Sequence, residues 1–195
     1  MFNELATMMI MMWPAVPIFL IELHFAINFW RKIGLWTYLV LLIEWLPIGI
    51  ALYLFQNQLL SIEVLLATPF LVFGIVLIAV ALALHSWTAK LIGLKATIGY
   101  IELKPDEQSK KQPLVTSGPF SVVRHPSYWA HAAIMAGIFF ITGVVATGII
   151  AIIDLAINYF ITTTLEDREL VDRFGNKYKE YQERIPKFFP KIFKT

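Results

Sequence analysis

The sequence predicts an all-α membrane protein, a polytopic bundle of about five transmembrane helices with an amphipathic helical tail at its C-terminus. Three observations predict this fold class. Of the 195 residues, 58% are hydrophobic and only 15% are charged, whereas soluble domains contain about 25% charged residues. The mean hydropathy is +0.68. The apolar residues also form runs that approach or exceed the roughly 20 residues that a membrane-spanning helix requires.

The apolar runs follow one another within a single membrane domain that includes residues 1–195. Pro14 and Pro17 lie inside the first run, and we expect them to bend that helix. The fourth run is short, so we expect it to tilt little or to begin among the lipid headgroups. The uncharged turn TGVVATG, where the fourth run passes into the fifth, predicts a helical hairpin. The expected spans are about 5–30, 33–55, 64–87, 127–141 and 144–165.

The basic residues predict the orientation of the chain. All sixteen Lys and Arg lie at Arg31 and Lys32, in the loop between spans three and four, or after span five. With five crossings, these three segments lie on one side of the membrane. Short loops rich in Lys and Arg face the cytoplasm, so we expect the N-terminus outside and the C-terminus in the cytoplasm. The alternative to a functional role is that most of these basic residues only set the topology and contact anionic lipid.

Two polar segments face the cytoplasm in this arrangement, the loop 89–126 and the tail 166–195. The tail predicts helices over about 166–173 and 177–184, interrupted at Phe174 and Gly175. Its apolar and aromatic side chains recur at helical spacing, which is also typical of a helix lying on the membrane surface. The chain has no cysteine. This excludes disulfides, a thiolate nucleophile and a cysteine-based zinc site.

Several polar residues lie in or near the apolar runs, and such groups are often functional. Asp154 and Asn158 are one turn apart, so we expect them to form one polar patch. Hydrogen bonding between helices is the alternative explanation for each of them. No spacing such as His-Glu-x-x-His is present, and we predict no metal site. The sequence assigns no role to Glu22, His24, Glu44, His85 or Asp154.

The strongest motif is LVTSGPFSVVRHPSYW, which begins at Leu114 and ends at Trp129. The hydrophobic hairpin follows it, and then LEDRELVDRFGNKYKEYQERIPKFFP. Together they resemble the isoprenylcysteine carboxyl methyltransferase family and its phospholipid methyltransferase relatives. The resemblance covers residues 114–190 and implies an integral membrane methyltransferase. It implies S-adenosylmethionine as the cofactor and S-adenosylhomocysteine as the product.

The resemblance also implies site residues. It makes Glu166 and Arg124 catalytic, and it gives a cofactor site made of Gln112, Leu114, Val115, Phe120, His125, Pro126, Ser127, Tyr128 and Glu166. Gln112 stands where many members have His, and Phe120 stands where many have Tyr. The carboxyl methyltransferases have an Arg at the position of Thr162, one turn before Glu166. This departure argues against a carboxylate acceptor.

The local chemistry agrees with these roles. Pro126 keeps His125 out of helical geometry, so its ring can point into a cleft, and Arg124 can bind a carboxylate with its planar fork. The alternatives are that Arg124 reaches the lipid headgroups and that His125 caps span four. A carboxylate at Glu166 can hold cationic groups of the cofactor or accept a proton from the nucleophile.

Three classes of function remain open at this point. The first is methylation of a membrane lipid or lipidated molecule: an isoprenylcysteine carboxylate, a phospholipid amine, or a small hydrophobic thiol or amine. The second is an NADPH-dependent reductase similar to membrane sterol reductases, which share an Arg-His-Pro hairpin and an aromatic tail. The third is a small transporter or membrane scaffold. We expect the bilayer and a lipid-like substrate as partners, and no nucleic acid. The sequence does not indicate an oligomeric state.

Overall fold

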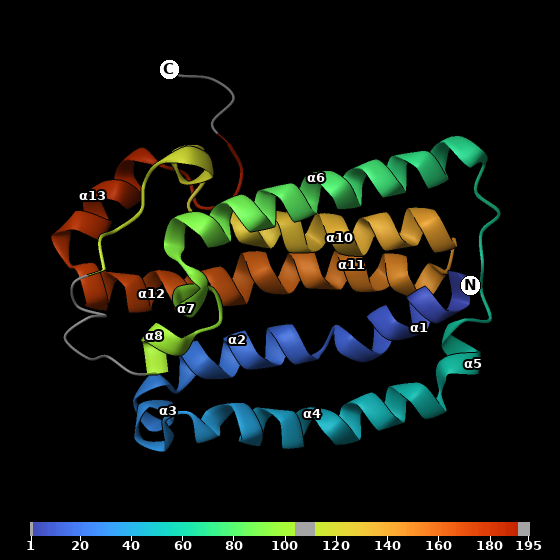
Figure 1. Ribbon diagram of the computed structural model, residues 1–195, viewed down its shortest axis with the longest axis horizontal. Helices are drawn as coiled ribbons and strands as arrows, with labels where there is room; N and C mark the ends of the chain where they lie inside the picture. Colours follow the sequence, from blue (N-terminus) through green and yellow to red (C-terminus); the bar gives the residue numbers. More distant parts are fainter. Residues whose placement is uncertain (1, 104–111, 191–195) are drawn as a thin grey trace.

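The computed structural model describes residues 2–103 and 112–190. Within these ranges the regular elements are helices, which run back and forth along one axis (Figure 1). They are α1 (Phe2–Met12), α2 (Ala15–Phe25), α3 (Ile27–Ile33), α4 (Trp36–Leu54), α5 (Gln56–Leu59), α6 (Thr68–Ile92), α7 (Leu94–Thr97), α8 (Tyr100–Leu103), the 3-10 turn η1 (Gly118–Ser121), α10 (Pro126–Thr142), α11 (Val145–Ile157), the π-helical turn η2 (Asn158–Thr162), α12 (Thr163–Phe174) and α13 (Asn176–Arg184).

The lengths of these helices confirm the predicted fold class. Four stretches of the described residues are long and apolar enough to cross a membrane: Asn3–Phe25, Trp36–Leu54, Thr68–Ile92 and Val145–Phe174. The predicted fourth span, α10, has 17 residues and is about 25 Å long, which is shorter than the roughly 30 Å hydrocarbon core. It packs along α6 and α11. The protein is an all-α polytopic helical bundle, and the side of the membrane that each end faces stays a prediction.

The first span differs from its expected bounds. Trp13 and Pro14 separate α1 from α2, whereas Pro17 lies in the first turn of α2, where its missing N–H breaks no helical hydrogen bond. The bend therefore belongs to Pro14. The helix ends at Phe25 instead of near residue 30, because Ala26 leaves helical geometry with φ −121° and ψ 37°. The next residues form α3, which packs against α8.

The last span is longer than expected. The helix does not end near residue 165 but continues through the π-helical turn into α12 and stops at Phe174. Gly175 follows with φ +61°, a conformation that favours glycine. The predicted interruption at Phe174 and Gly175 is thus confirmed. As a consequence, the acidic residues after Leu165 lie on the end of a spanning helix, and α13 folds back beside them (Figure 1).

Close packing of α6 and α10 fixes the beginning of α10. A Cβ atom at Gly74 would lie 2.7 Å from the carbonyl oxygen of Gly137, so the two backbones touch at this point. Near the other end of the contact, Ser127 Oγ donates to Thr88 Oγ1 over 3.1 Å. The loop that precedes α10 is thereby held against the end of α6. We call this end of the bundle, with α7, α8, η1, α12 and α13, the polar end (left in Figure 1).

Candidate active site

A cavity of about 570 Å³ opens at the polar end, between α2, α6, α10 and α12. Its volume lies within the range of about 300–1,000 Å³ that small-molecule sites occupy. It brings together nearly all of the predicted site residues, which come from the loop and from α12. Those that line it are Gln112, Leu114, Val115, Phe120, Arg124, His125, Ser127, Tyr128 and Glu166. Pro126 is buried but does not line the cavity.

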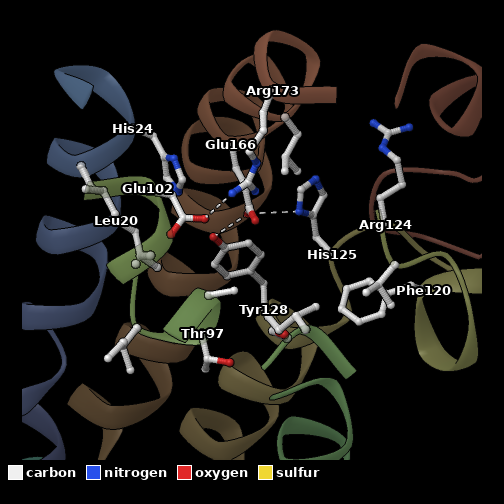
Figure 2. Close-up of a pocket in the computed structure, with 18 of the residues that line it drawn as sticks. Leu20, His24, Thr97, Glu102, Phe120, Arg124, His125, Tyr128, Glu166 and Arg173 are labelled. Atoms are coloured by element: carbon white, nitrogen blue, oxygen red, sulfur yellow. Dashed lines mark hydrogen bonds and ion pairs between the residues drawn. The ribbon is translucent and has the colours of Figure 1, made fainter. Parts of the chain in front are cut away.

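Glu166 presents its carboxylate to this cavity from α12. Tyr128, in the first turn of α10, donates from its hydroxyl to Glu166 Oε2 over 2.8 Å. The Nδ1 atom of His125 lies 3.2 Å from the same oxygen. Figure 2 shows the two rings converging on the carboxylate. The loop motif and the tail, which are far apart in the sequence, therefore meet at one oxygen atom.

The other ring nitrogen of His125 binds Asp167. His125 Nε2 lies 2.8 Å from Asp167 Oδ1, which also accepts from Tyr178 Oη over 2.5 Å. Arg124 Nη2 donates to Asp167 Oδ2 over 2.7 Å. We call Arg124, His125, Asp167 and Tyr178 the loop–tail clamp, because a residue of the tail here holds two residues of the loop and one of α13.

The charges around His125 keep it protonated at neutral pH. Its burial, the largest single effect, disfavours the imidazolium. The negative charges and hydrogen bonds of Glu166 and Asp167 together outweigh this effect and raise the pKa of His125 from 6.5 to about 8. Both ring nitrogens then act as donors to carboxylates. His125 is therefore a fixed cation between two anions, and it does not act as a proton acceptor.

Arg124 lies between Asp167 and the end of α13, and its predicted catalytic role stays a prediction. Besides Asp167, its guanidinium binds the backbone carbonyls of Gln182 and Ile185 over 3.2 and 2.9 Å. Figure 2 shows it on the other side of His125 from Glu166. The two alternative roles, headgroup contact for Arg124 and a cap for His125, are wrong. The Arg124 side chain is only 9% exposed, so it does not reach the headgroups, and His125 makes no capping hydrogen bond to α10.

Two charged residues of the cavity were not predicted from the sequence. Arg173 Nη1 lies 3.1 Å from Glu102 Oε1, and both residues line the cavity. Arg173 follows Glu166 by seven residues, two helical turns, so the spacing contained a signal for it. That signal was hidden because basic residues of the tail also set membrane orientation. Glu102 lies in a short helix with no such pattern, and burial raises its pKa.

All four histidines of the chain line this one cavity: His24, His85, His125 and His131. His131 belongs to a second polar group, built around the fully buried Asp154. Asp154 accepts from Trp13 Nε1 over 2.8 Å, and from His131 Nδ1 and Asn158 Nδ2 over 2.9 Å each. The predicted patch of Asp154 and Asn158 is confirmed. We call Trp13, His131, Asp154 and Asn158 the Asp154 cluster.

Several buried polar atoms that belong to cavity-lining residues lack a partner. His24 Nδ1, Glu102 Oε2 and Gln112 Oε1 make no hydrogen bond within the described part of the chain. Buried polar atoms are rarely left unpaired in proteins. A polar ligand with both donors and acceptors would satisfy them. Among the described residues, no group of three or more His, Asp or Glu side chains is arranged to hold a metal ion.

Comparison with known proteins shows which proteins this chain resembles. The chain is 30% identical over 150 residues to the methanethiol S-methyltransferase of Pseudomonas deceptionensis, a match that covers 76% of this chain and 53% of that protein. It is 35% identical over 83 residues to the cobalt-zinc-cadmium resistance protein CzcN of Cupriavidus metallidurans, covering 43% of this chain and 38% of that protein. The chain thus spans about half the length of the first relative, and less of the second.

No solved structure matches the chain. The model of the phospholipid methyltransferase family matches residues 69–177, which is more than half of the chain and includes α6, the motif loop and the hairpin up to the start of α13. The protein therefore belongs to the phospholipid methyltransferase family.

Proposed function

We propose that this protein transfers a methyl group from S-adenosylmethionine to a small, membrane-partitioned acceptor. The observation that carries the proposal is the cavity itself. The loop motif and Glu166 line it together, and unpaired polar atoms belong to its lining residues. Membership of a methyltransferase family and the name of the Pseudomonas relative support the same reaction class.

The residues of the cavity suit this cofactor. When bound, S-adenosylmethionine supplies a methyl group on a sulfonium cation, and it also has an ammonium group and an adenine ring. Glu166 offers negative charge for the cationic groups, and Phe120 and Tyr128 offer apolar and aromatic surface. The unpaired oxygens of Glu102 and Gln112 can accept hydrogen bonds from amino groups.

The chain's own groups then act mainly by positioning. Tyr128 and His125 hold the Glu166 carboxylate in one orientation, so it needs little rearrangement when a cation binds. Methyl transfer requires an in-line approach of the nucleophile, and fixed geometry of this kind supplies a large part of the rate. The apolar wall from α2, with Val16, Phe19 and Leu20, helps to keep water away from the reacting atoms.

A thiol is the acceptor that fits best. Thr162 has no charge to hold a carboxylate, and its buried hydroxyl makes no hydrogen bond among the described residues. Its neighbour Thr163, in contrast, donates to the Tyr159 carbonyl of the same helix. Arg173 is already paired with Glu102. The relative is named for methanethiol, and a small thiol is neutral and apolar enough to enter from the bilayer.

The reductase and transporter alternatives are less well supported. NADPH carries several phosphates, whereas the cationic side chains that line the cavity, Arg124, His125 and Arg173, each face a carboxylate. A transporter or scaffold has no need for a cavity that combines the loop motif with Glu166. These two alternatives therefore serve as controls in the test.

The test is ligand-dependent stability of the purified protein in detergent, with S-adenosylhomocysteine, with NADPH and with neither. At about 100 times its dissociation constant, S-adenosylhomocysteine should add about 2.7 kcal/mol to the free energy of unfolding. Stabilisation by NADPH alone would overturn the proposal. An activity screen with a prenylcysteine analogue, phosphatidylethanolamine and a small thiol then identifies the acceptor. Efficient carboxyl methylation of the prenylcysteine would contradict the thiol assignment.

Glu166→Gln sharpens this test. Because the loss of a hydrogen bond to a charged group costs about 1.5–3 kcal/mol, the variant should bind S-adenosylhomocysteine about 10- to 100-fold more weakly. The matched control is Asp172→Asn, which makes the same type of change at an exposed position of the same helix. Calorimetry measures both affinities, and equal affinity in wild type and Glu166→Gln would remove Glu166 from the site.

A further inference from the structure

We propose that the cavity has a separate acceptor subsite inside the bundle, and that His131, held by Asp154, takes the proton of the acceptor thiol there. The inference rests on the proposed methyl transfer and goes beyond it, because it assigns a subsite and a base. Part of the subsite, the N-terminal half of α2, lies outside the residues that match the family model.

The cavity is elongated along α2. Its lining includes Ala15 and Val16 at the beginning of this helix and His24 near its end, nine residues or about 13 Å from Ala15. At the His24 end the lining is polar, with Glu102, Glu166 and the loop. Towards Ala15 it is mainly apolar, with Val16 and Phe19. We call this second part, together with His85 and His131, the deep arm.

His131 lies at the level of the deep arm. It follows Tyr128 by three residues on α10, which places both on one face of the helix with His131 one turn further from the polar end. Trp13, next to the beginning of α2, donates to the same Asp154 that holds His131. This shared partner joins His131 to the region of Ala15 and Val16. A molecule in the deep arm therefore approaches Glu166 and Tyr128 from inside the bundle.

The contact with Asp154 orients the His131 ring and selects the nitrogen that carries the hydrogen. An ionised carboxylate only accepts hydrogen bonds, so Nδ1 of His131 carries the hydrogen in its 2.9 Å contact with Asp154. In the neutral ring the proton is then absent from Nε2, which has a free lone pair. Among the residues that the structure describes, Nε2 makes no hydrogen bond. The 19% exposed side chain lines the cavity.

The other three histidines lack this combination. His125 uses both ring nitrogens on carboxylates and is held as a cation. His24 has a buried Nδ1 with no partner in the described structure, so no carboxylate holds that nitrogen. His85 faces the deep arm but has no side-chain hydrogen bond within the described ranges to orient it. Only His131 is oriented by a carboxylate and open to the cavity.

The proposed step balances as follows. Nε2 of His131 takes the proton of the S–H group, and the sulfur forms a new S–C bond to the methyl group. The bond between that methyl and the sulfonium sulfur breaks, so S-adenosylhomocysteine leaves as a neutral thioether. The new thioether is neutral too. The proton remains on His131 as an imidazolium paired with the Asp154 carboxylate, until it passes to water after the product leaves.

The test uses His131→Asn, since the Asn amide can still donate to Asp154 where Nδ1 did but has no basic nitrogen. The full chain in detergent is assayed with thiophenol, which is largely ionised at neutral pH, and with an alkanethiol, which is largely protonated. Loss of a general base costs about 10²- to 10⁴-fold. We expect a loss of at least about 100-fold on the alkanethiol, and less than about tenfold on thiophenol.

S-adenosylhomocysteine affinity, measured by calorimetry, gives a second readout. It should be unchanged in His131→Asn, and His131→Gln serves as a second variant if the first does not fold. Equal losses on the two thiols, no loss on either, or weakened S-adenosylhomocysteine binding would each overturn the role of His131. Absence of binding by wild type would instead overturn the proposed function, so the two failures are distinguishable.

Discussion

The loop–tail clamp and the Asp154 cluster are two solutions to the same problem. Each surrounds a buried aspartate with several donors, and each includes a histidine that lines the cavity. They differ in the charge of the partners. Asp167 faces an arginine and a protonated histidine, whereas Asp154 faces an indole, an amide and a histidine with one nitrogen bound.

This difference separates a histidine with both ring nitrogens bound from one with a ring nitrogen open to the cavity. His125 has no free ring nitrogen, because Glu166 and Asp167 bind one each. His131 is bound through one nitrogen, so the other remains available to a ligand. A histidine beside a carboxylate is therefore not by itself a sign of acid–base chemistry. The number of its nitrogens already in use decides what it can do.

The largest effect is expected at Asp167. Asp167→Asn removes the negative charge that faces Arg124 and His125, both of which are buried. Removal of one partner of a buried ion pair typically costs about 3–5 kcal/mol, so the free energy of unfolding should fall by about that amount. Denaturant unfolding in detergent measures it, with the exposed Asp172→Asn as control. A loss as small as that of the control would show that the clamp does not hold the fold.

Asp154→Asn should destabilise the protein less, although Asp154 is the more deeply buried of the two. Its partners include no arginine or lysine, so the substitution leaves no permanent opposite charge unpaired. The substitution replaces one accepting oxygen by an NH₂ group, which then faces a donor. The lost hydrogen bond should cost about 1–3 kcal/mol. The same unfolding experiment, run beside Asp167→Asn, compares the two sites directly. If Asp154→Asn is the more destabilising variant, burial rather than partner charge sets the cost.

The sequence anticipated the clamp better than the Asp154 cluster. The clamp joins the loop motif and the tail motif, and both can be recognised from the sequence. The loop and Glu166 could therefore be assigned to one site before their contacts were known. The individual contacts within the clamp could not be predicted from the sequence. Helical periodicity turns Asp167 away from Glu166, and nothing in that pattern indicates that Arg124 and Tyr178 meet there.

The Asp154 cluster depends on pairing between distant helices. The spacing of Asp154 and Asn158 predicted one contact within a helix, and that contact exists. Trp13 comes from the turn between α1 and α2, and His131 comes from α10. These two contacts with Asp154 depend on how the helices pack against one another, and hydrophobic periodicity alone does not determine that packing. The π-helical turn after α11, which extends the span into α12, has no sequence signal that we recognise.

The pH dependence of stability tests the state of His125. Because its pKa is raised from 6.5 to about 8, protonation stabilises the folded protein. This contribution is fully present below pH 6.5 and is lost as the pH rises through about 8. A shift of this size corresponds to about 2 kcal/mol. Unfolding measured from pH 6 to pH 9 should show the decline, and His125→Asn should abolish it. Stability that rises over this interval would contradict a protonated His125.

The smallest effect on stability is expected at Tyr181, which lies next to the clamp but does not bind its charged groups. Tyr181 is buried on α13, and its hydroxyl donates to the backbone carbonyl of Phe120 over 2.5 Å. Tyr178, also buried on α13, donates over the same distance to the Asp167 carboxylate. The two positions form a matched pair, since a change to Phe removes one hydroxyl from each and leaves the ring in place.

A neutral hydrogen bond contributes about 0.5–1.5 kcal/mol and one to a charged group about 1.5–3 kcal/mol. Tyr181→Phe should therefore cost about 1 kcal/mol and Tyr178→Phe about twice as much. Denaturant midpoints of the two variants measure the difference directly, because each variant removes one tyrosine hydroxyl from the same helix. Equal costs would mean that the charge of Asp167 adds nothing to its bond with Tyr178. In that case the strength of the clamp would lie in its packing, and the contrast with the Asp154 cluster would have to be drawn from burial alone.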